Sequence, residues 1–310
     1  MKLFITGVSG LLGSNMAQQL LELHEVAGCY HSHPFNLAGI TSVEVDLSNP
    51  QGIAAALRQT QPDLVVNTVA LTDVEACEAD PELAYSINVT TARHVAAAAQ
   101  QTGGRLIHLS TDHLSNGINP WQREEDTTCP LNVYAKTKLE SEKVVQSICP
   151  EALVIRTNFY GWGNGVRISF SDWILGALNR SEPLNMFTDV WFTPILINDL
   201  TALMLQLSDG GATGIFNVAG KERVSKHAFA LQLAEVYGLP ATGIHTASVT
   251  DFSFKVPRPR DMSLSSQKAE DFLRKSMPTL REGLGRLRSL GEQSHQAILE
   301  RAIQSTLSNT

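Results

Sequence analysis

The sequence lacks an excess of basic residues. Its 310 residues include 24 Lys and Arg against 31 Asp and Glu, which gives a formal net charge of -7. A nucleic-acid-binding surface usually needs a basic footprint, so we expect no nucleic-acid partner. The acidic balance does not exclude an anionic small substrate, because a local pocket can oppose the charge of the whole molecule.

Cysteines are few and are not clustered. The four are Cys29, Cys77, Cys129 and Cys149, and no two stand at CxxC or similar spacing. We therefore expect reduced thiols in a cytoplasmic protein rather than a disulfide framework. His31 and His33 have no carboxylate or cysteine partners at metal-ligand spacing, so we expect no metal site.

Long apolar runs are also absent. No stretch approaches the ~18 unbroken apolar residues that a transmembrane helix needs. The first residues do not combine a basic segment with a long apolar run, so they do not read as a signal peptide. We expect no membrane partner.

The first half of the chain alternates short apolar runs with helical patterns. The expected strands are 2–6, 25–30, 42–45, 63–68, 105–109 and 152–156. Near-continuous apolar strands separated by helices predict a parallel sheet that is covered on both faces. The fold class is therefore α/β, with a doubly wound parallel sheet of the Rossmann type.

The second half shows fewer strands and more irregular chain. We expect a dinucleotide-binding domain over residues 1–157 and a smaller C-terminal substrate lobe over 158–310, with a part near 190–220 that returns to complete the sheet. The pattern also predicts one long Ala-rich helix over 81–101 and a terminal amphipathic helix over 293–307 that docks onto the body.

A glycine loop joins the first expected strand to the first helix. It reads Thr6-Gly7-Val8-Ser9-Gly10-Leu11-Leu12-Gly13. Gly7 permits a tight turn, Gly10 lets the backbone approach a pyrophosphate, and Gly13 allows the helix to pack closely on the strand. The free N–H groups at the start of the helix would face the phosphates. This context predicts a dinucleotide site.

Tyr134 and Lys138 stand four residues apart and share one face of an expected helix. An ammonium beside a phenol favours the phenolate, so we expect the pKa of Tyr134 to fall from ~10 toward neutral pH. Such a tyrosine is a candidate general acid or base for hydride chemistry at a carbonyl. A surface tyrosine and lysine on an ordinary helix would give the same spacing.

The glycine loop, in the form TGxxGxxG, and the YxxxK pair together resemble the extended branch of the short-chain dehydrogenase/reductase superfamily. Residues 62–67, 79–88, 109–112, 217–220 and 258–261 resemble the dTDP-4-dehydrorhamnose reductase family, and the likeness covers roughly residues 2–288. The stretch 119–143 is also similar to the regulatory beta subunit of methionine adenosyltransferase, a member of the same group.

The resemblance implies roles for four residues of the catalytic centre. Thr111 matches the residue that hydrogen-bonds the reacting oxygen, and Tyr134 matches the proton donor. Lys138 matches the residue that lowers the tyrosine pKa and binds the nicotinamide ribose. Asn88 matches an asparagine that kinks a helix and holds a proton-relay water. A turn cap at Thr111 and a plain polar helix position at Asn88 are the structural alternatives.

The resemblance also implies further binding residues. Asp46 matches an acid that meets the adenine amine, with an N-cap as an equal alternative, and Leu47 and Ala70 join the cofactor site. We expect Thr72, His113, Phe159 and Arg258 to contact the substrate. His113 departs from the family pattern, and Phe159 stands near an aromatic position that the chain does not match, so the sugar is left open.

Cofactor choice depends on the end of the second expected strand. An acid there would hold the ribose 2′-OH of NAD, and a basic residue would accept the 2′-phosphate of NADP. This chain has no acid there but has His31 and Ser32, which favours NADP, with NAD as the alternative.

The resemblance implies an NADP-dependent reductase of a nucleotide-linked 4-keto-sugar. Two alternatives stay open at this point. One is an NADP-binding regulatory subunit of a methionine adenosyltransferase-like enzyme, and the other is a nucleotide-sugar epimerase or dehydratase. The sequence leaves a homodimer open as well.

Overall fold

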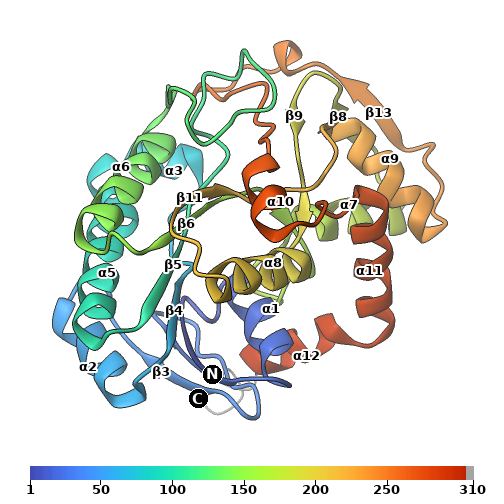
Figure 1. The fold of residues 1–310 in the computed structure, drawn as a ribbon. Coiled ribbons are helices and arrows are strands. Elements are labelled where there is room, and N and C mark those ends of the chain that lie inside the picture. The colour runs from blue at the N-terminus through green and yellow to red at the C-terminus, as the bar shows by residue number, and fades with distance from the viewer. Residues whose placement is uncertain (305–310) are drawn as a thin grey trace.

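The computed structural model describes residues 1–304, and its centre is a seven-stranded parallel sheet (Figure 1). The strand order is β11-β6-β5-β4-β1-β2-β3. The bounds are β1 (Lys2–Thr6), β2 (Glu25–Tyr30), β3 (Thr41–Glu44), β4 (Leu64–Asn67), β5 (Arg105–Leu109), β6 (Leu153–Arg156) and β11 (Gly214–Asn217). The expected doubly wound α/β fold is confirmed. β11 comes from the second half of the chain and pairs with β6.

Helices cover both faces of this sheet. One face carries α1 (Leu11–Leu20), α8 (Ile197–Asp209) and α10 (Gln267–Leu273), and the other carries α2 (Pro50–Thr60), α5 (Thr91–Thr102) and α6 (Val133–Ile148) (Figure 1). Successive residues of a strand point to opposite faces, so Leu64 and Val66 pack into one apolar core and Val65 into the other. This is why β4 is buried along its whole length.

The strand order reverses beside β1. The chain runs from β1 outward to β2 and β3, then returns to β4 on the other side of β1. Ligands of such sheets bind in the crevice outside the carboxyl ends of the strands at this switch point. We therefore expect a ligand-binding site in the crevice beyond the carboxyl ends of β1 and β4.

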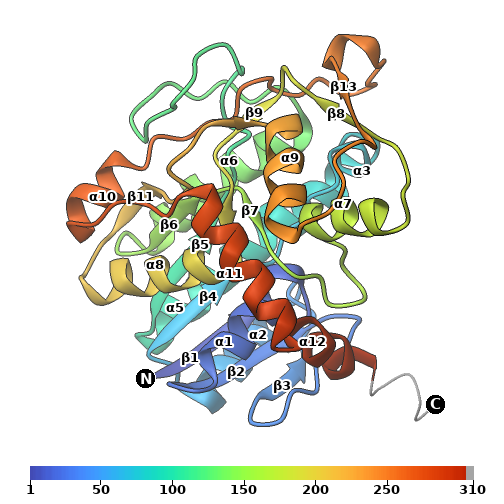
Figure 2. The same cartoon turned by 90° about the vertical axis from the view of Figure 1, so that its right-hand side faces the viewer.

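The second half also forms a lobe with its own apolar core. Its helices are α7 (Phe170–Asn179), α9 (Lys226–Tyr237) and α11 (Leu280–Glu292). Three strand pairs accompany them: β7 (Phe159–Tyr160) with β10 (Ile195–Leu196), β9 (Trp191–Phe192) with β12 (Val224–Ser225), and β8 (Leu184–Phe187) with β13 (Ile244–Ala247). Figure 2 shows α11 running from this lobe to α12 (His295–Gln304), which packs beside α1.

The helix predicted over 81–101 is wrong as one continuous element. The chain instead forms α4 (Pro81–Tyr85), a π-helical turn η1 (Ser86–Thr90) and then α5, and a short unpredicted helix α3 (Val74–Ala79) comes before them. The break coincides with Asn88, whose side chain hydrogen-bonds to the backbone of Leu71 in the loop after β4 rather than to solvent.

The predicted terminal helix is present as α12 up to Gln304, and residues 305–307 of that prediction lie outside the described residues. In the described part of the chain, no helix is both long and apolar enough to cross a bilayer.

Candidate active site

The glycine loop turns tightly between β1 and α1. Gly7 has a φ of 69°, a left-handed conformation that favours glycine. A Cβ on Gly13 would lie only 2.3 Å from the carbonyl oxygen of Gly7, so only glycine lets α1 approach the turn this closely. No side chain of the described residues caps α1. The backbone N–H groups of Leu11 and Leu12, in the first turn of α1, therefore have no side-chain acceptor. Unpaired N–H groups of this kind are what an anion-binding site requires.

The second half of the chain holds this loop in place. The Asn164 amide Nδ2 lies 3.0 Å from the carbonyl oxygen of Ser9 and 3.3 Å from that of Gly10, and it donates to both. It also lies 3.0 Å from Ser14 Oγ. Asn164 is fully buried. Nothing in its local sequence indicated this contact, because it joins positions about 150 residues apart.

The residues expected at the adenosine end lie beyond β2 and β3. His31 and Ser32 follow β2 and are exposed. The Asp46 carboxylate accepts from Ser48 N–H at 2.9 Å, and the hydrogen bonds from Ser48 lower its pKa, with His31 close enough to add to this effect. Asn49, not Asp46, is the N-cap of α2. The side chain of Asp46 is therefore exposed and is not used to cap the helix.

Leu47 and Ala70 also lie at the edge of the crevice. Leu47 is buried, and its carbonyl oxygen accepts from the ring Nδ1 of His94 at 2.9 Å. Ala70 follows β4 and is half-buried. The structure thus places both residues after strands of the central sheet, on the side where the glycine loop lies.

Thr111, Tyr134 and Lys138 come together although β5 and α6 contribute them separately. Thr111 stands two residues beyond the end of β5 and is buried, as are Tyr134 and Lys138 in the first turns of α6. Tyr134 and Thr111 share a side-chain hydrogen bond. The Lys138 ammonium donates to the carbonyl oxygen of Leu109 at 2.7 Å, which uses one of its three protons.

The expected direction of the Tyr134 pKa is wrong. Burial raises the pKa of Tyr134 well above its ordinary value, and the bond from Thr111 opposes this only in part. Burial also lowers the pKa of Lys138 to about 8. Desolvation is the largest cause and the negative charge of Asp112 adds to it, so Tyr134 is a neutral phenol at neutral pH and can give up a proton rather than take one.

Asn88 occupies the π-helical turn between α4 and α5. Its Oδ1 accepts from the N–H of Leu71 at 2.7 Å, and its Nδ2 donates to the Leu71 carbonyl at 3.2 Å and to Thr137 Oγ1 at 3.0 Å. The side chain therefore ties the loop after β4 to α6, which carries Tyr134 and Lys138.

A buried ion pair supports the segment that leads from β5 to Thr111. Arg156 on β6 binds both carboxylate oxygens of Glu142 on α6, at 2.9 and 2.8 Å. Ser110 Oγ donates to the same carboxylate at 2.5 Å. These contacts fix the backbone next to Thr111 against the helix that carries Tyr134.

Asp112 and His113 continue from Thr111 toward the substrate lobe. Asp112 Oδ2 accepts from Asn158 Nδ2 at 2.6 Å, and its Oδ1 lies 3.9 Å from His113 Nε2. The His113 ring meets Tyr134 edge to face, with 5.6 Å between ring centroids. Burial lowers the pKa of His113, while the charge of Asp112 opposes that shift. His113 Nδ1 is buried without a hydrogen-bond partner in the described structure.

Lys226 is a charged group near the site that sequence analysis missed. It is the first residue of α9, where a positive charge opposes the helix dipole. Its ammonium lies 3.4 Å from the ring centroid of Phe192 and 4.7 Å from that of Phe170. Burial lowers its pKa to about 8, and the nearby charge of Asp112 works against this. Among the described residues no carboxylate lies within 4.0 Å of it.

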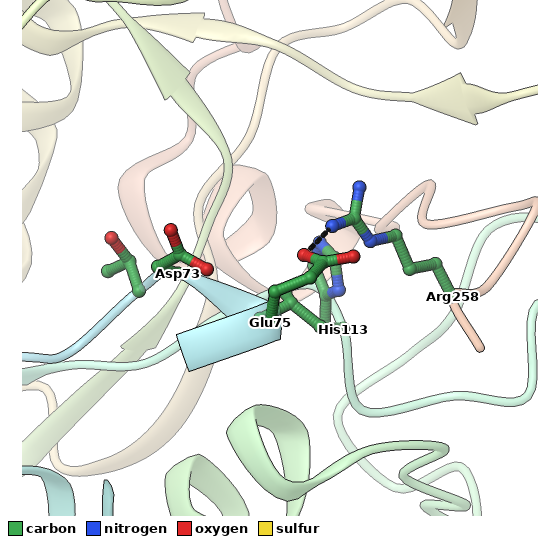
Figure 3. Close-up of a pocket in the computed structure, with 6 residues that line it drawn as sticks. Asp73, Glu75, His113 and Arg258 are labelled. Atoms are coloured by element: carbon green, nitrogen blue, oxygen red, sulfur yellow. Dashed lines mark hydrogen bonds and ion pairs between the residues drawn. The ribbon is translucent and has the colours of Figure 1, made fainter. Parts of the chain in front are cut away.

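A cavity of about 310 Å³ opens beside His113 (Figure 3). Its lining residues are Thr72, Asp73, Val74, Glu75, His113 and Arg258. The Arg258 guanidinium reaches across the cavity and forms an ion pair with Glu75 on α3. Asp261, three residues further along the chain, binds Arg223 at 2.6 Å.

Three of the four predicted substrate residues thus meet around one cavity: Thr72, His113 and Arg258. Phe159 does not line it. That residue lies on β7 and packs partly against the core beside the central sheet. Its side chain is half-buried there. No three His, Cys, Asp or Glu side chains of residues 1–304 gather as a metal site would require.

The chain matches known proteins over nearly its whole length. The family model described as "RmlD substrate binding domain" matches residues 1–290. The probable low-salt glycan biosynthesis reductase Agl14 of Haloferax volcanii is 32% identical over 289 residues, 92% of this chain and 96% of that protein. The dTDP-4-dehydrorhamnose reductase of Salmonella typhimurium LT2 is 33% identical over 235 residues, 72% of this chain and 78% of that protein.

Solved structures share the fold. A dTDP-4-dehydrorhamnose reductase from Bacillus anthracis, solved in complex with NADP, superposes with a TM-score of 0.82 at 23% identity, covering 93% of this chain and 98% of that one. At this level of identity the match shows the fold alone.

Proposed function

The chain belongs to the RmlD substrate-binding-domain family, and from this membership we propose that it reduces a nucleotide-linked 4-keto-sugar with NADPH. The reductase names of the two relatives above support this activity. The observation that carries it is local: a neutral, buried Tyr134 shares a hydrogen bond with Thr111, which follows β5 at the same edge of the parallel sheet as the glycine loop that follows β1. That arrangement suits delivery of a proton to a carbonyl oxygen.

The glycine loop fits a dinucleotide. Gly13 lacks the Cβ that would collide with Gly7, and α1 begins without a side-chain cap. Leu11 and Leu12 would hold the pyrophosphate through their N–H groups, together with Ser9 and Gly10 of the same turn. The rest of the cofactor would meet His31 and Ser32 at the 2′-phosphate, Asp46, Leu47 and Ala70 along the adenosine and nicotinamide path, and Lys138 at the nicotinamide ribose.

NADPH supplies the hydride when it is bound. Tyr134 gives its proton to the oxygen of the substrate carbonyl, and Thr111 donates to the same oxygen while charge develops on it. The phenol of Tyr134 is protonated at neutral pH, as transfer of its proton requires. Asn88 keeps the loop after β4 fixed to α6 during this step.

The cavity beside His113 would receive the sugar and its diphosphate. Thr72 and His113 offer a hydroxyl and an imidazole with a free ring nitrogen. Among the described residues that line the cavity, Arg258 supplies the guanidinium, and this group suits phosphate oxygens. A diphosphate at this point would replace Glu75 as the partner of Arg258.

The proposal is tested by following NADPH oxidation with a panel of nucleotide-linked 4-keto-sugars. Tyr134→Phe should lower kcat by ~10²–10⁴-fold, because proton transfer by a placed side chain contributes about that much. NADPH affinity should be retained. Tyr85→Phe removes the hydroxyl of an exposed tyrosine and serves as the matched control. Normal turnover by Tyr134→Phe on a verified substrate would remove Tyr134 from this role.

The same assay separates the alternatives. A reductase consumes one NADPH for each sugar, whereas an epimerase or dehydratase restores its cofactor within each turnover. A regulatory subunit would bind NADPH without consuming it. A cytoplasmic location and a homodimer stay predictions.

A further inference from the structure

An exposed aromatic cluster lies next to Arg258 of the cavity lining, and the proposed chemistry does not use it. Phe252 and Phe254 follow the short 3-10 helix η2 (Val249–Asp251) and are 44% and 40% exposed. Their rings are stacked, with centroids 6.2 Å apart and planes at 26°. Phe187, at the end of β8, meets both rings edge to face at 5.2 and 6.1 Å. Large apolar groups gathered at a surface often mark a binding site.

This cluster is continuous with the cavity. The Arg258 guanidinium carbon lies 5.0 Å from the ring centroid of Phe254, and the same side chain lines the cavity together with His113 (Figure 3). His113 in turn meets Tyr134. The order from the proton donor outward is therefore a phenol, an imidazole, a guanidinium and a pair of stacked phenyl rings.

The volume of the cavity limits how much of a ligand it can enclose. About 310 Å³ is at the low end of the ~300–1,000 Å³ that small-molecule sites occupy. A sugar with a diphosphate and a nucleoside is a long ligand, so its last part must lie outside this cavity. With the sugar at Tyr134 and the diphosphate at Arg258, the nucleobase comes next along the same line.

We propose that Phe252 and Phe254 form the subsite for the nucleobase of a nucleoside diphosphate, which stacks on their exposed faces while Arg258 holds the diphosphate. The proposal rests on the proposed function for the identity of the ligand. Aromatic faces stack with any base, and the cluster itself offers no polar group for reading a base edge. Phe187 packs edge to face against both rings.

The adenine of NADPH is not the occupant. The phosphates of a dinucleotide belong at the start of α1, and its adenosine end belongs beyond β2 and β3. The aromatic cluster instead belongs to the substrate lobe, on the segment after β13 that lies at the end of the molecule away from the N-terminus (Figure 1).

The experiment measures binding without turnover. Wild-type protein is titrated calorimetrically with dTDP, inorganic pyrophosphate and NADPH, and the titrations are repeated with Phe252→Leu and Phe254→Leu. Leucine keeps an apolar side chain but removes the aromatic face. Phe272→Leu is the matched control, because Phe272 is 43% exposed on α10 and contacts only Phe216 among the aromatic rings of the described structure.

We expect each of the two variants to weaken dTDP binding about tenfold, which corresponds to ~1.4 kcal/mol. Pyrophosphate and NADPH affinities should stay unchanged, and Phe272→Leu should bind all three ligands as the wild type does. Unchanged NADPH binding also shows that the variants are folded.

Two outcomes would overturn the subsite: unchanged dTDP affinity in both variants, or equal losses for dTDP and pyrophosphate, which would mean that only the position of Arg258 had changed. Failure of the proposed function looks different. If no keto-sugar supports NADPH oxidation but dTDP binding still depends on Phe252 and Phe254, the subsite stands and the reductase assignment falls.

Discussion

The cofactor end of the crevice is built mainly from backbone, whereas the substrate end is built from charged side chains of distant segments. At the glycine loop the working groups are N–H groups of one short stretch, placed by Gly7 and Gly13. At the cavity the groups are Glu75, His113 and Arg258, which are brought together from three loops and helices. The first end depends on close packing and the second on charge, so they should respond to different substitutions.

The largest effect should come from filling the close approach at the cofactor end. Gly13→Ala places a Cβ 2.3 Å from a backbone oxygen that cannot move aside cheaply. We expect a loss of ~1–3 kcal/mol in the free energy of unfolding, and NADPH affinity reduced by a hundredfold or more because the loop must shift. Thermal unfolding and fluorescence titration with NADPH measure the two effects.

Gly285→Ala is the matched control for that substitution. Gly285 lies within α11, and a Cβ there would meet nothing within 4 Å. Alanine should be neutral or stabilising by up to ~1 kcal/mol, as expected inside a helix. If Gly13→Ala behaves in the same way, the close packing of the loop is not what sets the cofactor site.

The next largest effect should come from removing the guanidinium of Arg258 at the substrate end. Arg258→Ala should weaken binding of the nucleotide-sugar by ~1.5–3 kcal/mol, the contribution of a hydrogen bond to a charged group, and should leave NADPH affinity unchanged. Calorimetry with both ligands measures this. Arg260→Ala is the control, because Arg260 is exposed and does not line the cavity.

Glu75→Gln tests the same contact from its other side. Removing the carboxylate frees Arg258 from its ion pair, so a nucleoside diphosphate should bind about twofold to fivefold more tightly, which fits the ~0.5–1 kcal/mol of a partly exposed ion pair. Weaker binding would mean that Glu75 positions Arg258 rather than competing for it.

A third effect concerns the free energy of unfolding, which the buried ammonium of Lys226 near the substrate end should lower. The folded-state pKa of Lys226 is about 8, below its ordinary 10.5, so folding disfavours its ammonium. This cost is fully present below pH 8 and fades as pH rises from 8 to 10.5. Lys226→Met should therefore stabilise the ligand-free protein by about 1 kcal/mol at pH 7, and the gain should shrink across that range.

Thermal unfolding of wild type and variant at pH 7, 8.5 and 10 measures this difference. Lys221→Met, at an exposed position, is the control and should change stability little at any of these values. A gain that grows with pH would contradict the assigned direction of the Lys226 pKa.

The smallest effect concerns the few side chains at the cofactor end. His31→Ala and Ser32→Ala should each lower the preference for NADPH over NADH about threefold, since both positions are exposed and a single solvated contact contributes ~0.5–1 kcal/mol. Titration with both cofactors measures the ratio. An unchanged ratio in the double variant would place the 2′-phosphate elsewhere.

Sequence reasoning correctly predicted the features that depend on residues close together in the chain. The sheet and the glycine loop follow from apolar runs and from spacing within a few residues. The spacing of Tyr134 and Lys138 also placed them on one helix, but it could not give the direction of the tyrosine pKa, which burial sets. The broken helix at Asn88 depends on bonds to Leu71 and Thr137, and no local propensity encodes those bonds.

The substrate end was only partly predictable for the same reason. The family resemblance suggested Thr72, His113 and Arg258, but the ion pair of Arg258 joins positions 183 residues apart. Lys226 looked like an ordinary residue at the start of a helix. Its closeness to Asp112 exists only after the lobe has folded against the sheet.

The Asn164 side chain limits how freely one half of this protein can be replaced by the same half of a relative. It bonds the Ser9 and Gly10 carbonyls from the far half of the chain, and α12 adds a second tie, from His295 Nε2 to Asn15 Oδ1 at 2.9 Å. A fragment of residues 1–157 would expose both sets of partners to water. Chimeras that graft a relative's second half onto this first half therefore need an amide at position 164 and a donor at position 295 before they are screened for new sugars.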